Sequence, residues 1–253
     1  MKRLIKIAEV CIAFLIGASL AILALSSALI SLEVPTLEET QEPANVSSLL
    51  SHEEQRGAKK SRQSAVRVLS MAENGQIASS TGTYITAQGK YYVISVMHGI
   101  HGTCETTRIH SHAGFNNCMR FVTLNEIADY AIIEIEKIPS LVPVKITASI
   151  PKGYEWKSAI AAQTEIFYTG FPNNTGPLTF NGRTIGYTDE GFVYLDSFAW
   201  GGSSGAGVFT ADGKFIGYIL AIDLGQTEFG ISVLENIVIM VPAFNIDWAI
   251  ILE

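Results

Sequence analysis

The chain has 253 residues and a net charge of −7, with 48% hydrophobic and 16% charged residues. Few charges together with many apolar residues exclude an intrinsically disordered chain, which needs the opposite composition. The acidic balance falls on residues 65–253, which alone carry −7, because residues 1–32 carry +2 and residues 33–64 carry −2. An acidic main part excludes nucleic acid as a partner, since phosphate binding needs clustered Lys and Arg.

Residues 10–32 are the first predicted element, a run without any charge that follows three basic residues. A run of about 20 apolar residues spans a bilayer as a helix, so this one is long enough with some tilt. The positive-inside rule then keeps the N-terminus cytoplasmic and places the rest outside the cytoplasm, in the periplasm or the extracellular space. A cleaved signal peptide is the alternative and would give a secreted protein, although signal h-regions usually run about 7–15 residues. We therefore expect residues 1–32 to be a membrane anchor or signal segment.

Residues 33–64 are predicted to be a flexible linker, because they mix Pro, Glu, Ser and Lys without a sustained periodicity. From residue 65 on, short β-type runs alternate with turn signals, and helical periodicity is weak before residues 243–253. The predicted strands are residues 65–71, 82–87, 91–96, 130–136, 165–171, 191–196, 207–211, 214–222 and 237–244. We therefore expect residues 65–253 to form an all-β domain of barrel type.

Two cysteines of this domain, Cys104 and Cys118, are close in the sequence. Outside the cytosol such a pair can close a short loop as a disulfide, which in the chain-entropy picture stabilises by about 3 kcal/mol. Two free thiols are the alternative.

The glycine-rich segment WGGSSGAGVF contains a candidate nucleophile, Ser204. Glycines let two backbone N–H groups converge on a developing oxyanion, which suits a catalytic serine. Taken alone, the segment also fits a plain hairpin loop, or a G-x-S-x-G elbow around Ser203.

The order of the other polar residues selects among serine hydrolases. The last histidine is His112 and the first aspartate is Asp129, which excludes a Ser-before-His order and an Asp-before-His order. Only the order His, Asp, Ser of chymotrypsin remains. His98 follows the predicted strand 91–96 and Asp129 precedes the strand 130–136. The alternative for His98 is a partly buried structural histidine, and the alternative for Asp129 is a carboxylate at a strand end that faces water.

A metal site is the competing interpretation of the histidines. The residues that would supply ligands fall close together: His98, His101, Cys104, Glu105, His110, His112 and Cys118. Histidines on a loop do not by their spacing fix a tetrahedral geometry, and the serine hydrolase order already uses His98. We therefore predict neither a metal nor another cofactor.

These segments together resemble the trypsin-like (chymotrypsin-fold) serine proteases, and most closely the bacterial periplasmic Deg/Htr type. STGTYITAQGKYYVISVMHGI is similar to that family's strand, turn and T-x-x-H segment, and ADYAIIEIE to its D-[IL]-A-[LV] segment. YLDSFAWGGSSGAGVFTADGKFIGYILAI is similar to its nucleophile segment with the strand that follows. EIFYTGFPNNTG and GISVLENIVIMVPAF resemble its remaining pieces, in order, over residues 65–245.

The resemblance implies two six-stranded β-barrels with the active site in the cleft between them. Carried over by position, it implies His98 as the general base, Asp129 as its orienting partner and Ser204 as the nucleophile. The backbone N–H groups of Gly202 and Ser204 would form the oxyanion hole, where each donor is worth roughly 10²–10³ in rate.

The resemblance also implies residues that bind the substrate. Leu220, Ala221 and Ile222 would line the substrate-facing strand, and Phe198 would lie near the floor of the pocket for the P1 side chain. No Asp stands at that floor, so a small or aliphatic P1 residue is expected rather than Lys or Arg.

Four departures from the family pattern matter. Ser203 replaces the Asp that captures a new N-terminus in digestive enzymes, which argues against that kind of zymogen activation. Ala206 replaces a second glycine and would restrict the loop. Leu220 replaces a hydroxyl residue, so Asp129 is expected to lose a hydrogen bond. No PDZ-like domain is expected, so recruitment and cage assembly through PDZ domains are not assumed.

We therefore expect a membrane-tethered serine endopeptidase that cleaves exported or unfolded polypeptides outside the cytoplasm. A catalytically inactive module of protease fold that binds peptides or partners is the alternative, followed by a metal-binding periplasmic domain. No feature of the sequence predicts an oligomeric state.

Overall fold

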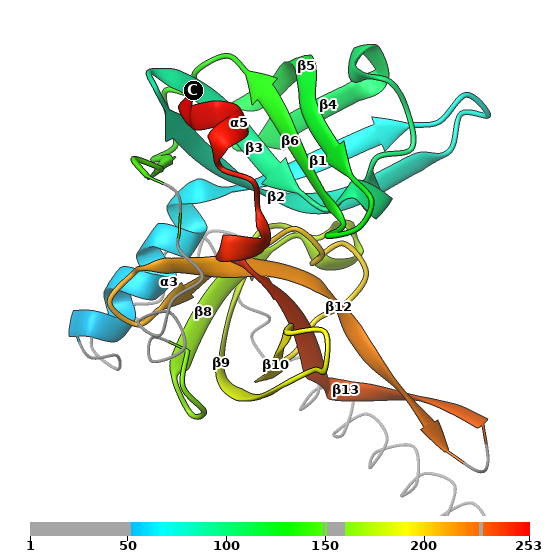
Figure 1. Cartoon of the computed structure of the whole chain (residues 1–253). Coiled ribbons are helices and arrows are strands. Elements are labelled where there is room, and N and C mark those ends of the chain that lie inside the picture. The colour runs from blue at the N-terminus through cyan, green and yellow to red at the C-terminus, as the bar shows by residue number, and fades with distance from the viewer. Residues whose placement is uncertain (1–51, 149, 151–159, 228–229) are drawn as a thin grey trace, which may run out of the picture. The chain divides into compact units, whose positions relative to one another are not determined.

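The computed structural model describes residues 52–253, apart from residues 149, 151–159 and 228–229 (Figure 1). For residues 52–55 and 221–235 only the backbone is described. The predicted anchor, residues 1–32, lies outside the described residues, as does the first part of the predicted linker. Within the described ranges, no helix is both long and apolar enough to cross a membrane.

The first barrel consists of six antiparallel strands in the order β1-β4-β5-β6-β3-β2, and it closes because β2 also pairs with β1. Its strands are β1 (Ala65–Met71), β2 (Ile77–Ala87), β3 (Lys90–Ser95), β4 (Thr107–Ser111), β5 (Gly114–Asn125) and β6 (Tyr130–Ile135). The short strand β7 (Val144–Lys145) adds to β2 in parallel. Gln88 and Gly89 join β2 to β3 with φ values of 49° and 77°, which a two-residue turn of type I′ requires.

The second barrel is closed in the order β10-β13-β12-β11-β8-β9. Its strands are β8 (Glu165–Gly170), β9 (Leu178–Tyr187), β10 (Val193–Asp196), β11 (Gly207–Thr210), β12 (Phe215–Thr227) and β13 (Gly230–Pro242). All nine predicted strands are present, and the predicted all-β architecture of two six-stranded barrels is confirmed.

Four strands lie in segments where the sequence predicted none: β4, β5, β7 and β9. Strand β5 carries apolar residues only singly or in pairs between polar ones, all of its residues are half-buried or exposed, and its pairing with β6 shifts register twice. Strand β9 likewise lacks an apolar run and is mostly exposed. Neither therefore shows the run of apolar residues by which a buried strand is recognised.

One apolar core is shared by the two barrels. Ile94 and Tyr130 of the first barrel pack in the same cluster as Tyr218 of β12 and Trp248, which precedes the short helix α5 (Ala249–Leu252). Figure 1 shows α5, in red, lying against the first barrel, and Gln88 Nε2 donates to the Leu252 carbonyl at 3.0 Å. The barrels are therefore held together by a continuous core as well as by surface contacts.

The last part of the predicted linker is a helix, α3 (His52–Ser64), so the linker prediction is wrong for these residues. The helix packs on β8, β9 and β11 of the second barrel. Gly57 and Ser61 are buried in this contact, where the Gly57 N–H donates to the Ala211 carbonyl (2.9 Å) and Ser61 Oγ lies 2.8 Å from Thr169 Oγ1. Small residues form the buried face, so no apolar periodicity marks the helix in the sequence.

Candidate active site

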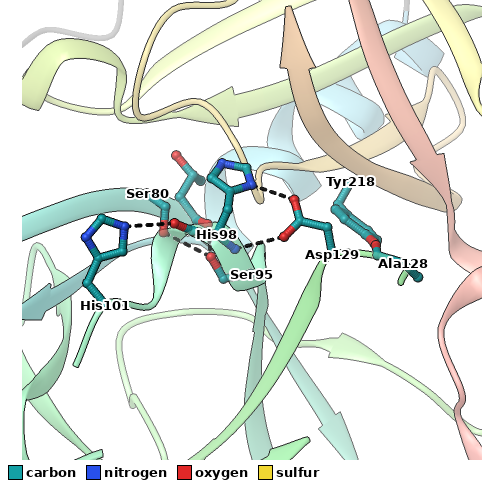
Figure 2. A network of polar contacts seen from close by, with 8 residues as sticks. Ser80, Ser95, His98, His101, Ala128, Asp129 and Tyr218 are labelled. Carbon is teal, nitrogen blue, oxygen red and sulfur yellow. Dashed lines mark hydrogen bonds and ion pairs between the residues drawn. The ribbon is translucent and has the colours of Figure 1, made fainter. Parts of the chain in front are cut away.

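His98 lies at the end of β3, in the 3₁₀ turn η2 (Met97–Gly99), with half of its side chain exposed. Its ring Nδ1 is 2.5 Å from Asp129 Oδ2, and its backbone N–H donates to Asp129 Oδ1 at 2.8 Å (Figure 2). An Nδ1–H that donates to a carboxylate leaves Nε2 as the hydrogen-bond acceptor of the ring. The arrangement therefore holds the imidazole in the tautomer that a general base needs.

Asp129 lies just before β6 in a left-handed backbone conformation, with φ of 50°. Aspartate tolerates this region better than most residues with a side chain. The Asp129 carbonyl accepts from the Met97 N–H at 3.2 Å, so the backbone and both carboxylate oxygens all bind the turn of His98. These contacts fix the carboxylate and the imidazole as one unit.

Tyr218 of the second barrel supports the same turn. Its hydroxyl donates to the carbonyl of Ala128 at 2.5 Å, one residue before Asp129 (Figure 2). Burial is the main cause that raises the pKa of Tyr218, and the negative charge of Asp129 raises it further. The hydroxyl therefore remains a hydrogen-bond donor. Tyr218 was not predicted, because it stands in the sequence only as one aromatic among the core residues of its strand.

No hydroxyl of β12 reaches the Asp129 carboxylate within the part of the chain that the structure describes. Leu220, where the family has a hydroxyl residue, is half-buried and packs on the shared core. The expected loss of a hydrogen bond to Asp129 agrees with this arrangement. Among the described residues, the Asp129 carboxylate accepts its two hydrogen bonds from the backbone N–H and the ring Nδ1–H of His98.

Ser204 lies in the loop between β10 and β11 and is half-buried, whereas Ser203 is 1% exposed. Ser203 Oγ accepts from the Trp200 N–H at 3.3 Å, so its hydroxyl is turned into the loop itself. The loop needs left-handed glycines on both sides, at Gly202 (φ 99°) and Gly205 (φ 88°). A Cβ at Gly205 would stand 2.0 Å from the Thr81 carbonyl oxygen, so only glycine fits there.

Thr81 of β2 joins the serine loop to the strand that leads to His98. Its N–H donates to the Ser204 carbonyl (2.8 Å), and its carbonyl accepts from Ser95 Oγ (2.6 Å), three residues before His98. Its Oγ1 donates to the Gly202 carbonyl at 2.6 Å. Thr81 was not predicted. The sequence feature that could have indicated it is the run of hydroxyl residues at 79–81 in β2, where a buried strand usually carries apolar residues.

The N–H groups of Gly202 and Ser204 donate no hydrogen bond to any residue that the structure describes. The Gly202 N–H shares its peptide group with the Gly201 carbonyl, which accepts from the Asn173 N–H at 2.7 Å. The Ser204 N–H shares its peptide group with the Ser203 carbonyl, which accepts from the Ala206 N–H at 3.0 Å, so both peptide groups are anchored at their acceptor ends. Anchored amides with free donors are the form that an oxyanion site takes.

The sequence model of the trypsin-like peptidase domain matches residues 68–217, more than half of the chain. The chain belongs to the trypsin-like peptidase family. By this membership it is a serine-type endopeptidase. A search of curated proteins finds no match by sequence. Among solved structures, the crystal structure of the serine endoprotease from Yersinia pestis is similar, with a TM-score of 0.58 and 16% identity, over 80% of this chain and 68% of that chain.

In this trypsin-like peptidase, the residues expected to bind substrate are only partly brought together. Phe198 is 50% exposed and stacks on Trp200, with ring centroids 6.3 Å apart, and Trp200 also contacts Phe180 at 5.8 Å. Strand β12 makes a bulge at Leu220, between Ile219 and Ala221. The side chains of Ala221 and Ile222 lie outside the described side chains.

The cysteine and histidine cluster does not converge on one point. Cys104 and Cys118 form a disulfide, with Cα atoms 5.3 Å apart. His101 Nε2 is 3.0 Å from the His98 carbonyl, and the His110 ring packs on Phe115 at 4.7 Å. Among the described residues, no three His, Cys, Asp or Glu side chains are grouped as metal ligands.

Proposed function

We propose that the chain cleaves peptide bonds with His98 as general base, Asp129 as its orienting partner and Ser204 as nucleophile. The observation that carries the proposal is the hydrogen bond between His98 Nδ1 and Asp129 Oδ2, which leaves Nε2 to accept a proton. The half-buried position of Ser204, against the full burial of Ser203, supports the choice of serine.

In this proposal, Ser204 Oγ attacks the scissile carbonyl as His98 Nε2 takes its proton. The carbonyl oxygen becomes an oxyanion that the N–H groups of Gly202 and Ser204 bind, and His98 then returns the proton to the leaving amine. Water hydrolyses the acyl-enzyme by the same steps. Asp129 accepts the Nδ1–H of His98 throughout and stabilises the imidazolium.

We further propose that the peptidase is held at a membrane by residues 1–32 and cleaves exported or unfolded polypeptides outside the cytoplasm. The uncharged run with basic residues before it supports the anchor. The disulfide supports an oxidising compartment, because such bonds are rare in the cytosol.

For the residue before the cleaved bond we propose a small or aliphatic side chain. Phe198 and Trp200 present an exposed apolar surface beside the serine loop, and neither carries a charge that would select Lys or Arg. A panel of peptide substrates that differ only at P1 would test this, and preferred cleavage after Lys or Arg would refute it.

The triad is tested by labelling the full chain with a fluorophosphonate, which reacts with activated serines. We expect labelling of the wild type, none of Ser204→Ala, and retained labelling of Ser203→Ala, the matched change one residue away. Labelling that survives in Ser204→Ala would overturn the assignment. Absence of labelling in the wild type, also with unfolded protein substrate present, would favour the inactive binding module.

A further inference from the structure

A basic cavity of about 570 Å³ lies between α3, β1 and the segment that follows β8, away from the catalytic residues. Lys59 and Arg62 of α3, Arg67 of β1, and His110 and His112 line it. No Asp or Glu lines it, and within the described part of the chain Lys59, Arg62 and Arg67 form no ion pair. The cavity thus holds positive charge without a protein counter-charge.

Arg67 is the most enclosed of these cations. Its guanidinium lies over the Phe171 ring at 5.1 Å, and one terminal nitrogen donates to the Thr175 carbonyl. Its Nε is buried and has no acceptor among the described residues. Burial also lowers the pKa of Arg67, as expected of a charge that has lost water. A partly desolvated guanidinium whose donors the protein does not fully satisfy is stabilised by an anionic oxygen within reach of its outer nitrogens.

Leu141, Phe171 and Pro177 form an apolar part of the cavity wall, beside uncharged polar residues. The guanidinium of Arg67 can donate two hydrogen bonds to one oxyanion, either a planar carboxylate or a tetrahedral phosphate. We propose that this cavity binds an oxyanion, a carboxylate or a phosphate group, and that its occupancy favours the open oxyanion hole.

The link to the oxyanion hole runs through the segment that follows β8. Asn173, two residues after Phe171, donates its N–H to the Gly201 carbonyl at 2.7 Å. The Phe171 N–H donates to Thr81 Oγ1 at 3.0 Å, and the same Oγ1 donates to the Gly202 carbonyl. The wall of the cavity and the oxyanion loop are therefore joined by two short hydrogen-bonded routes.

Whether a bound oxyanion raises or lowers the reactivity of Ser204 depends on which arrangement of the serine loop it stabilises. The described arrangement has both an accessible cavity and free N–H groups at Gly202 and Ser204. Because hydrogen bonds join the cavity wall to the loop, a rearranged loop would also alter the cavity, and a ligand that fits the described cavity better raises the population of this arrangement. Bound oxyanion is therefore expected to accelerate reaction at the serine, and this part rests on the proposed role of Ser204.

Binding is tested on the full chain by calorimetry at constant ionic strength, with inorganic phosphate and with an acetylated tri-glutamate peptide as separate probes. Lys59 is exposed and its side chain forms no hydrogen bond or ion pair with the described residues, so we expect Lys59→Glu to leave the fold intact. The matched control is Arg56→Glu, an exposed residue of the same helix that does not line the cavity. We expect Lys59→Glu to weaken Kd about tenfold and Arg56→Glu less than about twofold.

Binding of one probe alone would identify the group as phosphate or as carboxylate. The site is overturned if neither probe binds, or if the two variants weaken binding equally. The coupling is tested by the rate of fluorophosphonate labelling, which should rise about fivefold with bound probe in the wild type and in Arg56→Glu. Binding that leaves this rate unchanged overturns the coupling. Absent labelling with intact binding would instead refute the proposed role of Ser204.

Discussion

The two barrels contribute opposite kinds of structure to the candidate active site. The first barrel supplies His98 and Asp129, whose side chains bind each other and whose backbones are joined as well. The second supplies Ser204 on a loop whose N–H donors point to no described acceptor. In the proposed mechanism the first half is complete before substrate arrives, and the oxyanion of the substrate completes the second. Orientation and charge stabilisation are therefore built separately in this fold.

The largest effect is expected from breaking the first half, by Asp129→Asn. The amide cannot hold the Nδ1–H tautomer of His98, so Nε2 would no longer accept the proton of Ser204. We expect kcat/KM for hydrolysis of unfolded casein to fall about 10⁴-fold. Asp196→Asn, an exposed position at the end of β10, is the control and should leave the rate unchanged. Equal rates in the two variants would refute the role of Asp129.

The second half is broken most strongly by Gly205→Ala. The added Cβ would collide with the Thr81 carbonyl, and the left-handed backbone would be strained in addition. We expect the free energy of unfolding to fall by about 3 kcal/mol. Gly201→Ala is the matched control, because its nearest neighbour would stand 4.0 Å away. Urea denaturation measures both, and similar losses in the two would contradict the packing argument.

The junction between the two halves is tested by Thr81→Val. Valine keeps the shape but removes the hydroxyl that joins the Phe171 N–H to the Gly202 carbonyl. We expect kcat/KM to fall about tenfold, because the oxyanion loop loses one anchor. Thr86→Val, at an exposed hydroxyl of the same strand, serves as control. A full rate in Thr81→Val would show that the loop is anchored without the hydroxyl.

The smallest effect is expected for Tyr218→Phe, which removes the hydrogen bond to Ala128. Near neutral pH the variant should be less stable by about 1 kcal/mol. The raised pKa of Tyr218 means that the folded state holds this proton more tightly than the unfolded state. Wild-type stability therefore falls as pH rises above about 10, and the difference between the two proteins narrows there. Denaturation from about pH 8 to pH 11 checks this, and a constant difference would contradict it.

The fold and the hydrolase class could be predicted from the sequence where short segments show a recognisable pattern. Apolar runs marked the strands that fill the core, and the chain order of His98, Asp129 and Ser204 restricted the hydrolase class. Strand β5 was missed because its apolar residues stand singly or in pairs and all of its residues are half-buried or exposed. Helix α3 was missed because it docks with small residues, Gly57 and Ser61, rather than with an apolar stripe.

Residues that act across the two barrels could not be predicted from local patterns. Thr81 and Tyr218 matter because of partners more than 80 residues away in the chain, and nothing in their own segments indicates those partners. The substrate-binding surface is a similar case. Phe198 could be named from its position, but its stacking on Trp200 and their joint exposure depend on the folded loop.

The shared core has a consequence for the order in which the chain is made. Trp248 and Ile251 cover Ile94 and Tyr130 in the first barrel, and the Asp247 N–H donates to Tyr130 Oη at 3.1 Å. During vectorial synthesis, the barrel that carries His98 and Asp129 therefore lacks part of its cover until more than 100 further residues have emerged. Early segments would remain exposed to chaperones and other proteases during that time.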